Sequence, residues 1–286
     1  MTARKNPTGS TSTGAGVLRP HQLARHVDLV RLPCAQSLTP WVENYWMLHW
    51  DLPAGTSYCS STLPHPAHTL SVEKGWVRDG VAALGGPVVV TGVLTRRFDV
   101  TLAATGWVLG IKFRPGGFTS LTGADARSLR DTPVSPPSSI PTATVDALAQ
   151  LGPHLSADAC RESADSALEN LNCTTDPEYD ELLGIVAAML DDRTLIRVTQ
   201  VEEHCNIPAR RLQRLFAKYI GAPPKWVLAR YRIHDVVTEL DDGYDGSLAD
   251  LAARYGWFDQ AHFSREFTEL IGVPPSAYGL HISHER

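Results

Sequence analysis

The 286-residue sequence predicts an α+β protein, with strands in its N-terminal half and helices in the remainder. Three observations support this class. Short β-prone runs alternate with Gly and Pro up to about residue 135. An acidic stretch with helical apolar spacing follows. A segment near the C-terminus then occurs twice, 51 positions apart, and each copy joins a helical pattern to a Gly-Pro stop.

Both ends of the chain are predicted to be tails. Residues 1–18 are rich in Thr, Ser and Gly, and residues 281–286 follow the last expected helix. No apolar segment follows Arg4 and Lys5, so a secretory signal is not expected. No apolar run reaches the roughly 20 residues that cross a bilayer. We therefore expect a cytoplasmic protein without a membrane partner.

Residues 19–135 are predicted to form a small β-barrel, cupin-like in outline, or a sandwich. The segment 41–50 is dense in aromatic residues, and its alternating Trp46, Leu48 and Trp50 would share one face of a strand. The segments expected after it are strands at residues 68–73, 88–91, 97–102 and 107–113, a Gly-rich turn at 114–118, and a short helix from Phe118 or Ala124.

Four aromatic side chains of this domain fit a small-molecule pocket. They fit a packed core equally well, and the sequence leaves both interpretations open. The four residues are Tyr45, Trp46, Trp50 and Trp107.

Histidines are the most enzyme-like feature of the domain. Cupin barrels hold a metal with histidines and a glutamate, and His65, His68 and Glu73, with His49 upstream, supply those residue types. The paired histidines of such barrels are two positions apart, whereas His65 and His68 are three apart and would face opposite sides of a strand. Pro66 disturbs that strand further. The sequence therefore predicts no metal site.

Nothing else in the chain indicates catalysis. The five cysteines are scattered and form no C-x-x-C pair, which argues against a zinc site or a disulfide framework. We expect no cofactor and no enzyme activity. The alternative is a cupin-like metal-binding protein or enzyme with a vestigial helical tail.

The connector at residues 136–192 is predicted to be a Pro-rich linker followed by acidic helices. Its segment 141–192 carries 11 acidic side chains and 1 basic one. It therefore holds most of the acidity of a chain whose formal net charge is −5. Such helices suit a scaffold or a dimer surface. The expected helices span residues 142–151, 156–171 and 177–191, the last beginning at Asp176-Pro177-Glu178.

The repeated segment predicts two helix-turn-helix units. Ile220-Gly221-Ala222-Pro223-Pro224 recurs as Ile271-Gly272-Val273-Pro274-Pro275. Each copy closes an amphipathic helix with a glycine and stops it with prolines. A shorter amphipathic run precedes each copy.

The first unit is strongly basic in sequence. Seven basic residues and no acid lie between Cys205 and His234. Arg210 and Arg214 are four apart and share a helix face, with Gln213 beside them. Arg suits guanine and Gln suits adenine in the major groove. The second unit has nearby acids, so we predict that the first unit supplies most of the DNA affinity.

Residues 193–280 resemble the DNA-binding domain of the AraC/XylS family of transcription regulators. The resemblance rests on Arg211-Leu212-Gln213-Arg214-Leu215-Phe216 and on the stretch from Gly256 to Phe267 that ends in Gly272-Val273-Pro274-Pro275. It implies base contacts by Arg210, Gln213 and Arg214 in the first unit and by Gln260, Ala261 and Arg265 in the second. Phosphate contacts are expected from Arg211, Lys218, Lys225, Arg230 and His262.

Three positions depart from the family pattern. Glu202 stands where a small alanine is usual, Pro208 where a Ser or Thr cap is common, and Trp257 where Phe is usual. Glu202 is expected to loosen or re-angle the first unit.

The resemblance also implies a function. It predicts a sequence-specific regulator that binds double-stranded DNA, with RNA polymerase as a further partner if it is an activator. By the same logic residues 19–135 would bind a small-molecule effector or mediate homodimerisation.

Overall fold

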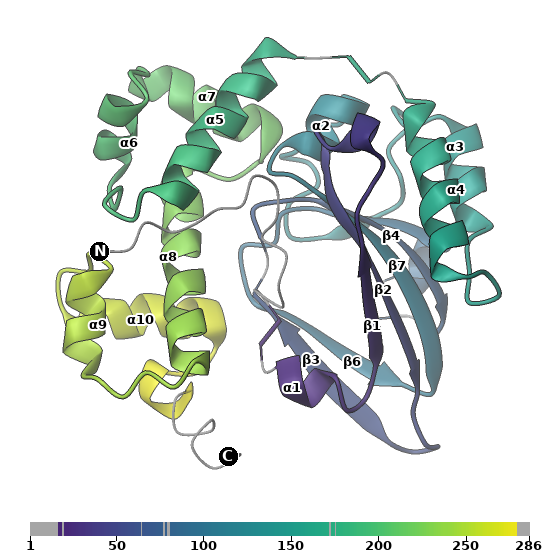
Figure 1. The fold of residues 1–286 in the computed structure, drawn as a ribbon, viewed down its shortest axis with the longest axis horizontal. Helices are drawn as coiled ribbons and strands as arrows, with labels where there is room; N and C mark the ends of the chain where they lie inside the picture. Colours follow the sequence, from purple (N-terminus) through teal and green to yellow (C-terminus); the bar gives the residue numbers. More distant parts are fainter. Residues whose placement is uncertain are drawn as a thin grey trace.

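The computed structural model describes residues 17–18, 20–63, 65–76, 78, 81–171, 173–174 and 176–278. In Figure 1 two antiparallel sheets lie on one side of the molecule and a helical part lies on the other. The predicted tails fall mostly outside the described residues. Val17 and Leu18 are the exception, because Val17 bridges Thr62 and the Leu18 side chain is buried. None of the described helices has the length and apolar content needed to span a membrane.

A six-stranded antiparallel sheet forms the centre of the N-terminal half. One of its faces is apolar and buried, and the other faces the second sheet. In spatial order its strands are β1 (Asp28–Leu32), β2 (Val42–Asp51), β7 (Thr105–Phe113), β4 (Thr69–Gly75), β5 (Val88–Thr91) and β8 (Pro133–Val134).

The second sheet consists of β3 (Ser57–Thr62) and β6 (Phe98–Ala103), paired from Ser57–Ala103 to Thr62–Phe98. Among the described strands these two pair only with each other, so the predicted closed barrel is not formed. The arrangement is an open two-sheet sandwich. The edge strand β1 was not predicted, because its residues alternate too weakly between apolar and polar to give a strand signal.

Short helices cover the buried face of the large sheet. Tyr45 on that face donates a hydrogen bond from its hydroxyl to Asp165 Oδ1 of α4 (2.6 Å). The same carboxylate oxygen accepts a hydrogen bond from the Ala35 amide (2.9 Å). These bonds attach α4 to the sheet. The helical segments of this half are α1 (Pro20–Leu23), η1 (Gln36–Leu38), η2 (Ala82–Leu84), α2 (Gly117–Thr122), α3 (Thr142–Ala149) and α4 (Ala157–Glu169).

The helical part contains the two predicted units. Gly221 and Gly272 have φ of 78° and 84°, the left-handed conformation that ends a helix without a Cβ clash. In Figure 1 the long helix α8 runs from one unit to the other. The helices are α5 (Pro177–Asp191), α6 (Val198–His204), α7 (Ala209–Tyr219), α8 (Pro224–Asp241), α9 (Leu248–Arg254) and α10 (Gln260–Ile271).

The hydrophobic cores cross the boundary between the two halves. One core contains the apolar face of the large sheet together with side chains of α5, α6 and α7 and the start of α8. A second core contains α8, α9 and α10, and it includes Leu18 and Leu63 from the N-terminal half. Both helix-turn-helix units are therefore packed against the sheet-containing half.

Candidate nucleic-acid interface and ligand cavity

Helix α7 presents an exposed polar face opposite a buried apolar one. Arg210, Gln213 and Arg214 are exposed. Leu212 and Phe216 are fully buried. The spacing of three and four residues places the exposed side chains together on one side of the helix. All three base-contact candidates of the first unit are thus brought together on the surface.

Helix α10 repeats this arrangement. Gln260, Ala261 and Arg265 are exposed, and Phe263 and Phe267 are fully buried. The Asp259 carboxylate caps the helix by accepting a hydrogen bond from the His262 amide (2.7 Å), which satisfies one of the free N–H groups of the first turn. The remaining three base-contact candidates therefore also share an exposed helix face.

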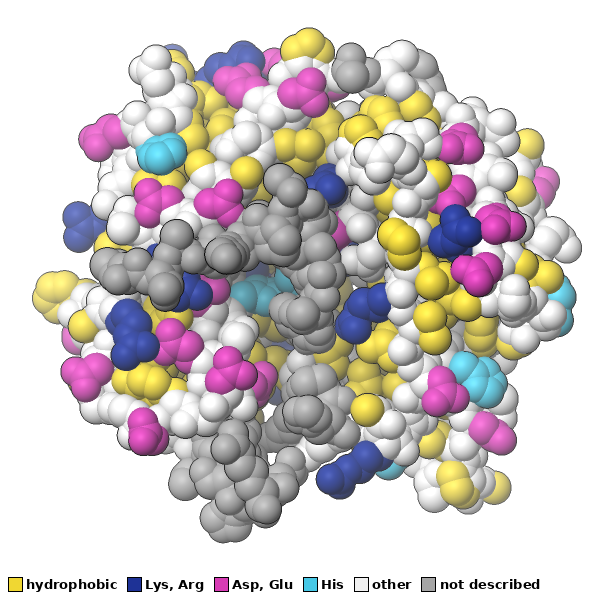
Figure 2. Space-filling model, in the orientation of Figure 1, with side chains coloured by type: hydrophobic (Ala, Val, Ile, Leu, Met, Phe, Trp, Pro, Cys, Tyr) yellow, Lys and Arg dark blue, Asp and Glu magenta, His cyan; other side chains and the backbone are white. Residues whose placement is uncertain are grey.

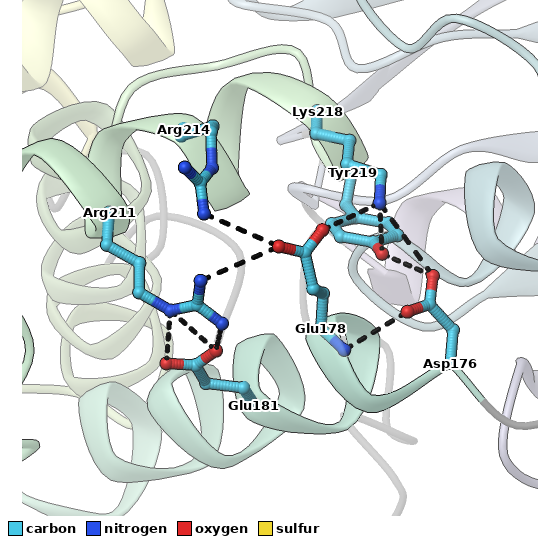
Figure 3. Close-up of polar contacts among 7 residues, drawn as sticks. All are labelled: Asp176, Glu178, Glu181, Arg211, Arg214, Lys218 and Tyr219. Carbon is cyan, nitrogen blue, oxygen red and sulfur yellow. Dashed lines mark hydrogen bonds and ion pairs between the residues drawn. The ribbon is translucent and has the colours of Figure 1, made fainter.

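Acidic residues of α5 bind the basic face of α7 (Figure 3). Arg211 Nε donates to both carboxylate oxygens of Glu181 at 2.9 and 3.0 Å. Glu178 accepts a hydrogen bond from Lys218 Nζ at 2.8 Å and lies 3.5 Å from Arg214 Nη2. These contacts join residues 30 to 40 positions apart. The acid-free basic stretch of the sequence is thus partly neutralised in the fold.

The ion pairs change the proton affinity of the groups involved. The hydrogen bond from Lys218 holds the pKa of Glu178 below its usual range, and the bond from Arg211 does the same for the pKa of Glu181. The Lys218 pKa is raised, chiefly by Glu178. All of these groups stay charged at neutral pH, because each partner stabilises the ionised form of the other.

The phosphate-contact candidates fall into different environments. Lys225 is exposed, and His262 is 44% exposed with its Nε2 3.6 Å from Glu266. The phosphate contact predicted for Arg230 is corrected by the structure. Its side chain is fully buried and its guanidinium lies 5.9 Å from the centre of the Trp226 ring, so it cannot reach a phosphate in this conformation. On the face shown in Figure 2, acidic and basic side chains are interspersed over the described surface.

The departures from the family pattern have local explanations. The Trp257 indole donates a hydrogen bond to Glu266, and Arg232 lies over its ring at 4.6 Å. Glu202 is half-buried at the surface of α6 and not enclosed between helices, and both α6 and α7 form. The expected loosening or re-angling of the first unit by Glu202 therefore stays a prediction. Pro208 occupies the N-cap position of α7 without a side-chain cap.

Phe258 was not predicted as a functional residue. Its side chain is 90% exposed immediately before α10, beside the cap Asp259. Among the described large apolar side chains, Val30 and Phe258 are the exposed ones, and Phe258 is the more exposed of the two. The sequence shows two adjacent aromatic residues, Trp257 and Phe258, before the polar start of α10. It does not show which ring is buried; in the structure Trp257 is 5% exposed.

A cavity of about 260 Å³ lies between the two sheets. Its walls are the inner face of the large sheet and the facing side of β3 and β6. Trp46, Leu48 and Trp50 of β2 line it, as their alternation predicted for one strand face. Apolar side chains of the smaller sheet, such as Val100 and Leu102, lie across from them.

Glycines of β7 make room for the two cavity tryptophans. Trp46 pairs with Gly110 and Trp50 with Gly106 across the strand boundary. A Cβ at Gly110 would lie 2.0 Å from the Trp46 ring, and one at Gly106 would lie 2.1 Å from the Trp50 ring. Both indoles thus rest directly on the backbone of β7 and form part of the cavity wall.

Charged pairs occur beside the cavity. Lys112 Nζ lies 3.0 Å from Glu43, and Arg78 Nη2 lies 3.0 Å from Glu73. Burial lowers the pKa of Lys112, and Glu43 opposes that shift. Arg31 of β1 also lines the cavity, and no carboxylate of the described residues forms an ion pair with it.

Two of the four predicted pocket residues lie elsewhere. Tyr45 and Trp107 are on the opposite face of the large sheet, in the core shared with α4. They alternate with the cavity-facing residues of β2 and β7, so the dense aromatic cluster is divided between two faces. The pocket prediction was therefore wrong for Tyr45 and Trp107.

The histidine pair is separated by the fold. His65 lines the cavity, and its ring centre lies 4.4 Å from that of His234 of α8, with the rings tilted by 31°. His68 is fully buried and stacks at 5.4 Å on Phe118. Burial lowers the His68 pKa to about 4. The described residues contain no group of three or more His, Cys, Asp and Glu side chains placed to hold a metal.

The wall of the cavity also contacts the helix-turn-helix units. Besides the contact between the His65 and His234 rings, Arg97 Nη1 donates a hydrogen bond to the Ile271 carbonyl at the end of α10 (2.7 Å). Arg97 directly precedes Phe98, which lines the cavity. Leu63, next to the cavity residue Thr62, is fully buried in the core of the second unit. A cavity-lining residue is thus directly followed or preceded in the chain by each of two residues that contact the second helix-turn-helix unit.

Two domain families match the chain. Residues 202–280 match the family described as "Helix-turn-helix domain", and residues 30–135 match a "Domain of unknown function". HTH-type transcriptional regulator GbdR of Pseudomonas aeruginosa is 26% identical over 108 residues, which cover 38% of this chain and 29% of GbdR. HTH-type transcriptional activator AarP of Providencia stuartii is 28% identical over 100 residues, covering 35% of this chain and 72% of AarP.

A solved structure was also found by fold comparison. ToxT of Vibrio cholerae aligns over 89% of this chain and 97% of its own, with 12% identity and a TM-score of 0.41. By the two family matches, the chain carries a helix-turn-helix domain at residues 202–280 and a domain of unknown function before it, at residues 30–135. The similarity to GbdR spans less than a third of that relative.

Proposed function

We propose that the protein is a sequence-specific, DNA-binding transcription regulator that acts in the cytoplasm and responds to a small molecule. The observation that carries this proposal is the paired geometry of α7 and α10. Each helix presents its base-contact candidates on one exposed face and buries its aromatic residues on the other. Two such helices joined by a rigid connecting helix suit two successive major grooves.

Base contacts are assigned by side-chain chemistry. Arg210, Arg214 and Arg265 suit the two acceptors of guanine, and Gln213 and Gln260 suit adenine. Ala261 offers a methyl group for contact with thymine. Phe258 extends the apolar part of this surface beside α10.

Phosphate contacts position the two units on DNA. Lys225 and His262 are exposed or half-exposed and suit this role directly. Arg211 and Lys218 can take part only by exchanging the carboxylates of α5 for phosphates. We therefore propose that α5 and the DNA backbone compete for the basic face of α7.

The N-terminal half is proposed to control the affinity of the protein for DNA. Its cavity has room for a small ligand, and its wall contacts α8 and α10. A ligand that changes this wall would change the relative placement of the two units, and with it the affinity for DNA. Homodimerisation and contact with RNA polymerase are further proposals that follow from the family resemblance.

A salt titration of full-length protein on a labelled duplex tests the DNA-binding proposal. The logarithm of the association constant should fall linearly with the logarithm of salt concentration, with a slope of roughly −0.9 per phosphate contacted. A binding constant that is independent of salt contradicts the proposal.

Single substitutions then test the assignment of the two helices. Arg214→Ala and Arg265→Ala should each weaken specific binding by roughly 1–3 kcal/mol, with the larger loss for Arg214. Equal or reversed losses in a titration contradict the greater share of the first unit.

A further inference from the structure

The strand register divides the cavity between the sheets into a polar end and an apolar end. Across the large sheet, Asn44 pairs with Lys112, Lys112 with Thr69, and Thr69 with Thr91. All four line the cavity. Residues in register across antiparallel strands share a face, so these polar side chains form one row.

The rows further along β2 are apolar. Leu48 pairs with Val108, and both line the cavity. Trp50 pairs with Gly106 and covers it. Trp76, which meets Trp50 edge to face at 6.2 Å, lines this end as well. A ligand that fills the cavity therefore meets aromatic and aliphatic walls at one end and hydrogen-bonding groups at the other.

The charges near the cavity do not balance. Glu43 and Glu73 are each bound by a cation, Lys112 and Arg78 respectively, at 3.0 Å. Among the described residues, Arg31 is the remaining charged lining residue; it is exposed on the edge strand β1 and pairs in register with Trp46 on the neighbouring strand. The described residues at the cavity thus carry one positive charge in excess, on the strand next to Trp46.

We infer that the cavity binds a small amphipathic anion, whose flat apolar body lies against Trp46 and Trp50 and whose carboxylate or similar head binds Arg31. Lys112 and Asn44, in the adjacent polar row, add hydrogen-bond donors for the same head. The inference rests on the proposed effector role and names the chemical class of the effector.

The volume of the cavity narrows the class of ligand further. The cavity of about 260 Å³ lies just under the roughly 300–1,000 Å³ of pockets for drug-sized ligands. The aromatic side chains Trp46, Trp50 and Trp76 supply much of the apolar wall. A one- or two-ring aromatic acid suits both this volume and these walls.

Three probes with one apolar body and different heads test this inference. Naphthalene-2-carboxylate, 2-naphthylmethanol and 2-naphthylmethylammonium are titrated into the full-length protein without DNA and followed by calorimetry. The anion should bind about tenfold or more tighter than the alcohol, as expected for a charge-assisted hydrogen bond. The ammonium should bind more weakly than both. Equal binding of the three probes, a preference for the alcohol or the ammonium, or no binding of the carboxylate overturns the inference.

Variants of Arg31 and Trp46 test where the charged head and the apolar body of the ligand bind. Arg31→Gln should remove most of the preference for the carboxylate, and Arg31→Lys should keep part of it. Arg96→Gln, which changes the net charge equally at an exposed site outside the cavity, should leave binding unchanged. Trp46→Leu should weaken the carboxylate and the alcohol alike. An unchanged preference in Arg31→Gln overturns the assignment of the head.

The test is independent of the proposed function. DNA binding of the same preparations is measured separately by anisotropy. Loss of carboxylate binding with normal DNA binding refutes the inference and leaves the regulator proposal standing. Normal carboxylate binding without DNA binding refutes the regulator proposal instead.

Discussion

The effect of replacing a glycine on the stability of this protein depends on which atoms the added Cβ would contact. Gly110 lies under the Trp46 ring, where a Cβ has no room, whereas a Cβ at Gly184 of α5 would meet no atom within 4 Å. Alternation in β2 was enough to predict that Trp46 and Trp50 share a face. It could not show that glycines of β7 lie beneath them, because that depends on the register between two strands about 60 positions apart.

Gly110→Ala should therefore destabilise the protein by about 1–3 kcal/mol, because the added methyl group displaces the Trp46 ring. The free energy of unfolding from urea denaturation measures the change. Gly184→Ala is the matched control and should stabilise by up to about 1 kcal/mol, since Ala favours a helix interior over Gly. A neutral Gly110→Ala would contradict the contact between Trp46 and β7.

His68 gives the protein a predictable response to acid. Its folded-state pKa of about 4 lies below the ordinary pKa of 6.5 for an unfolded histidine, so the unfolded state binds the proton more strongly. Stability should be fully present above pH 6.5 and be lost as the pH falls from 6.5 toward 4, by up to about 1.4 kcal/mol per pH unit.

Denaturant unfolding at pH 7 and pH 5 measures this response. Replacing His68 with Phe, which keeps the ring stack on Phe118, should reduce the loss of stability between these pH values. The control is His154→Phe, at a histidine that is exposed in the loop before α4. The same pH dependence in the wild type and in His68→Phe would assign the response to other groups.

At the scale of elements, α5 and α7 illustrate where the sequence was insufficient. Both helices were expected, and the predicted bounds 177–191 match those of α5. The acid-free stretch from Cys205 to His234 indicated a free basic face, but Glu178 and Glu181 neutralise part of it from 30 to 40 positions away. Charge counting along a chain sees only local neighbours, whereas ion pairs form between helices that the fold places together.

Glu178→Gln should raise DNA affinity by severalfold at low salt. Glu178 contacts Arg214, Lys218 and Arg211, and its neutral replacement frees these cations for phosphates. Anisotropy titration on one duplex gives the affinity. The increase should shrink as salt rises, because screening weakens exposed charge interactions.

A control separates this competition from a change of net charge. Asp146→Asn removes one negative charge from α3, at an exposed position outside the helical units. It should change DNA affinity much less than Glu178→Gln does. Equal increases in the two variants would show that long-range charge, and not release of the α7 face, is responsible.

In the whole molecule, the N-terminal and C-terminal halves share hydrophobic cores, although the sequence predicted separate domains. The sequence predicted a boundary at about residue 192 between a part with strands and a part with helices. The hydrophobic cores cross between these parts, because Leu18 and Leu63 complete the core of the second helix-turn-helix unit. Such packing between distant segments leaves no periodic signal in the sequence, since each of these leucines is a single apolar residue in an irregular stretch.

Leu63→Ala should loosen the second unit although it lies in the N-terminal half. Removing a fully buried leucine costs about 2–5 kcal/mol, and the cavity would open against α8, α9 and α10. Hydrogen exchange of α10 amides should accelerate. Leu102→Ala is the control, because Leu102 is buried in a separate cluster of the N-terminal half. Faster α10 exchange in Leu102→Ala, or none in Leu63→Ala, would contradict the shared core.

The central claim is that α7 and α10 each recognise a short DNA sequence. Selection of bound duplexes from a random library by the full-length protein tests it most directly. We expect an enriched site with two short motifs about one helical turn, roughly 10 bp, apart. Arg214→Ala should relax one motif and Arg265→Ala the other. A library without enrichment, or a single motif that both substitutions affect alike, would contradict the claim.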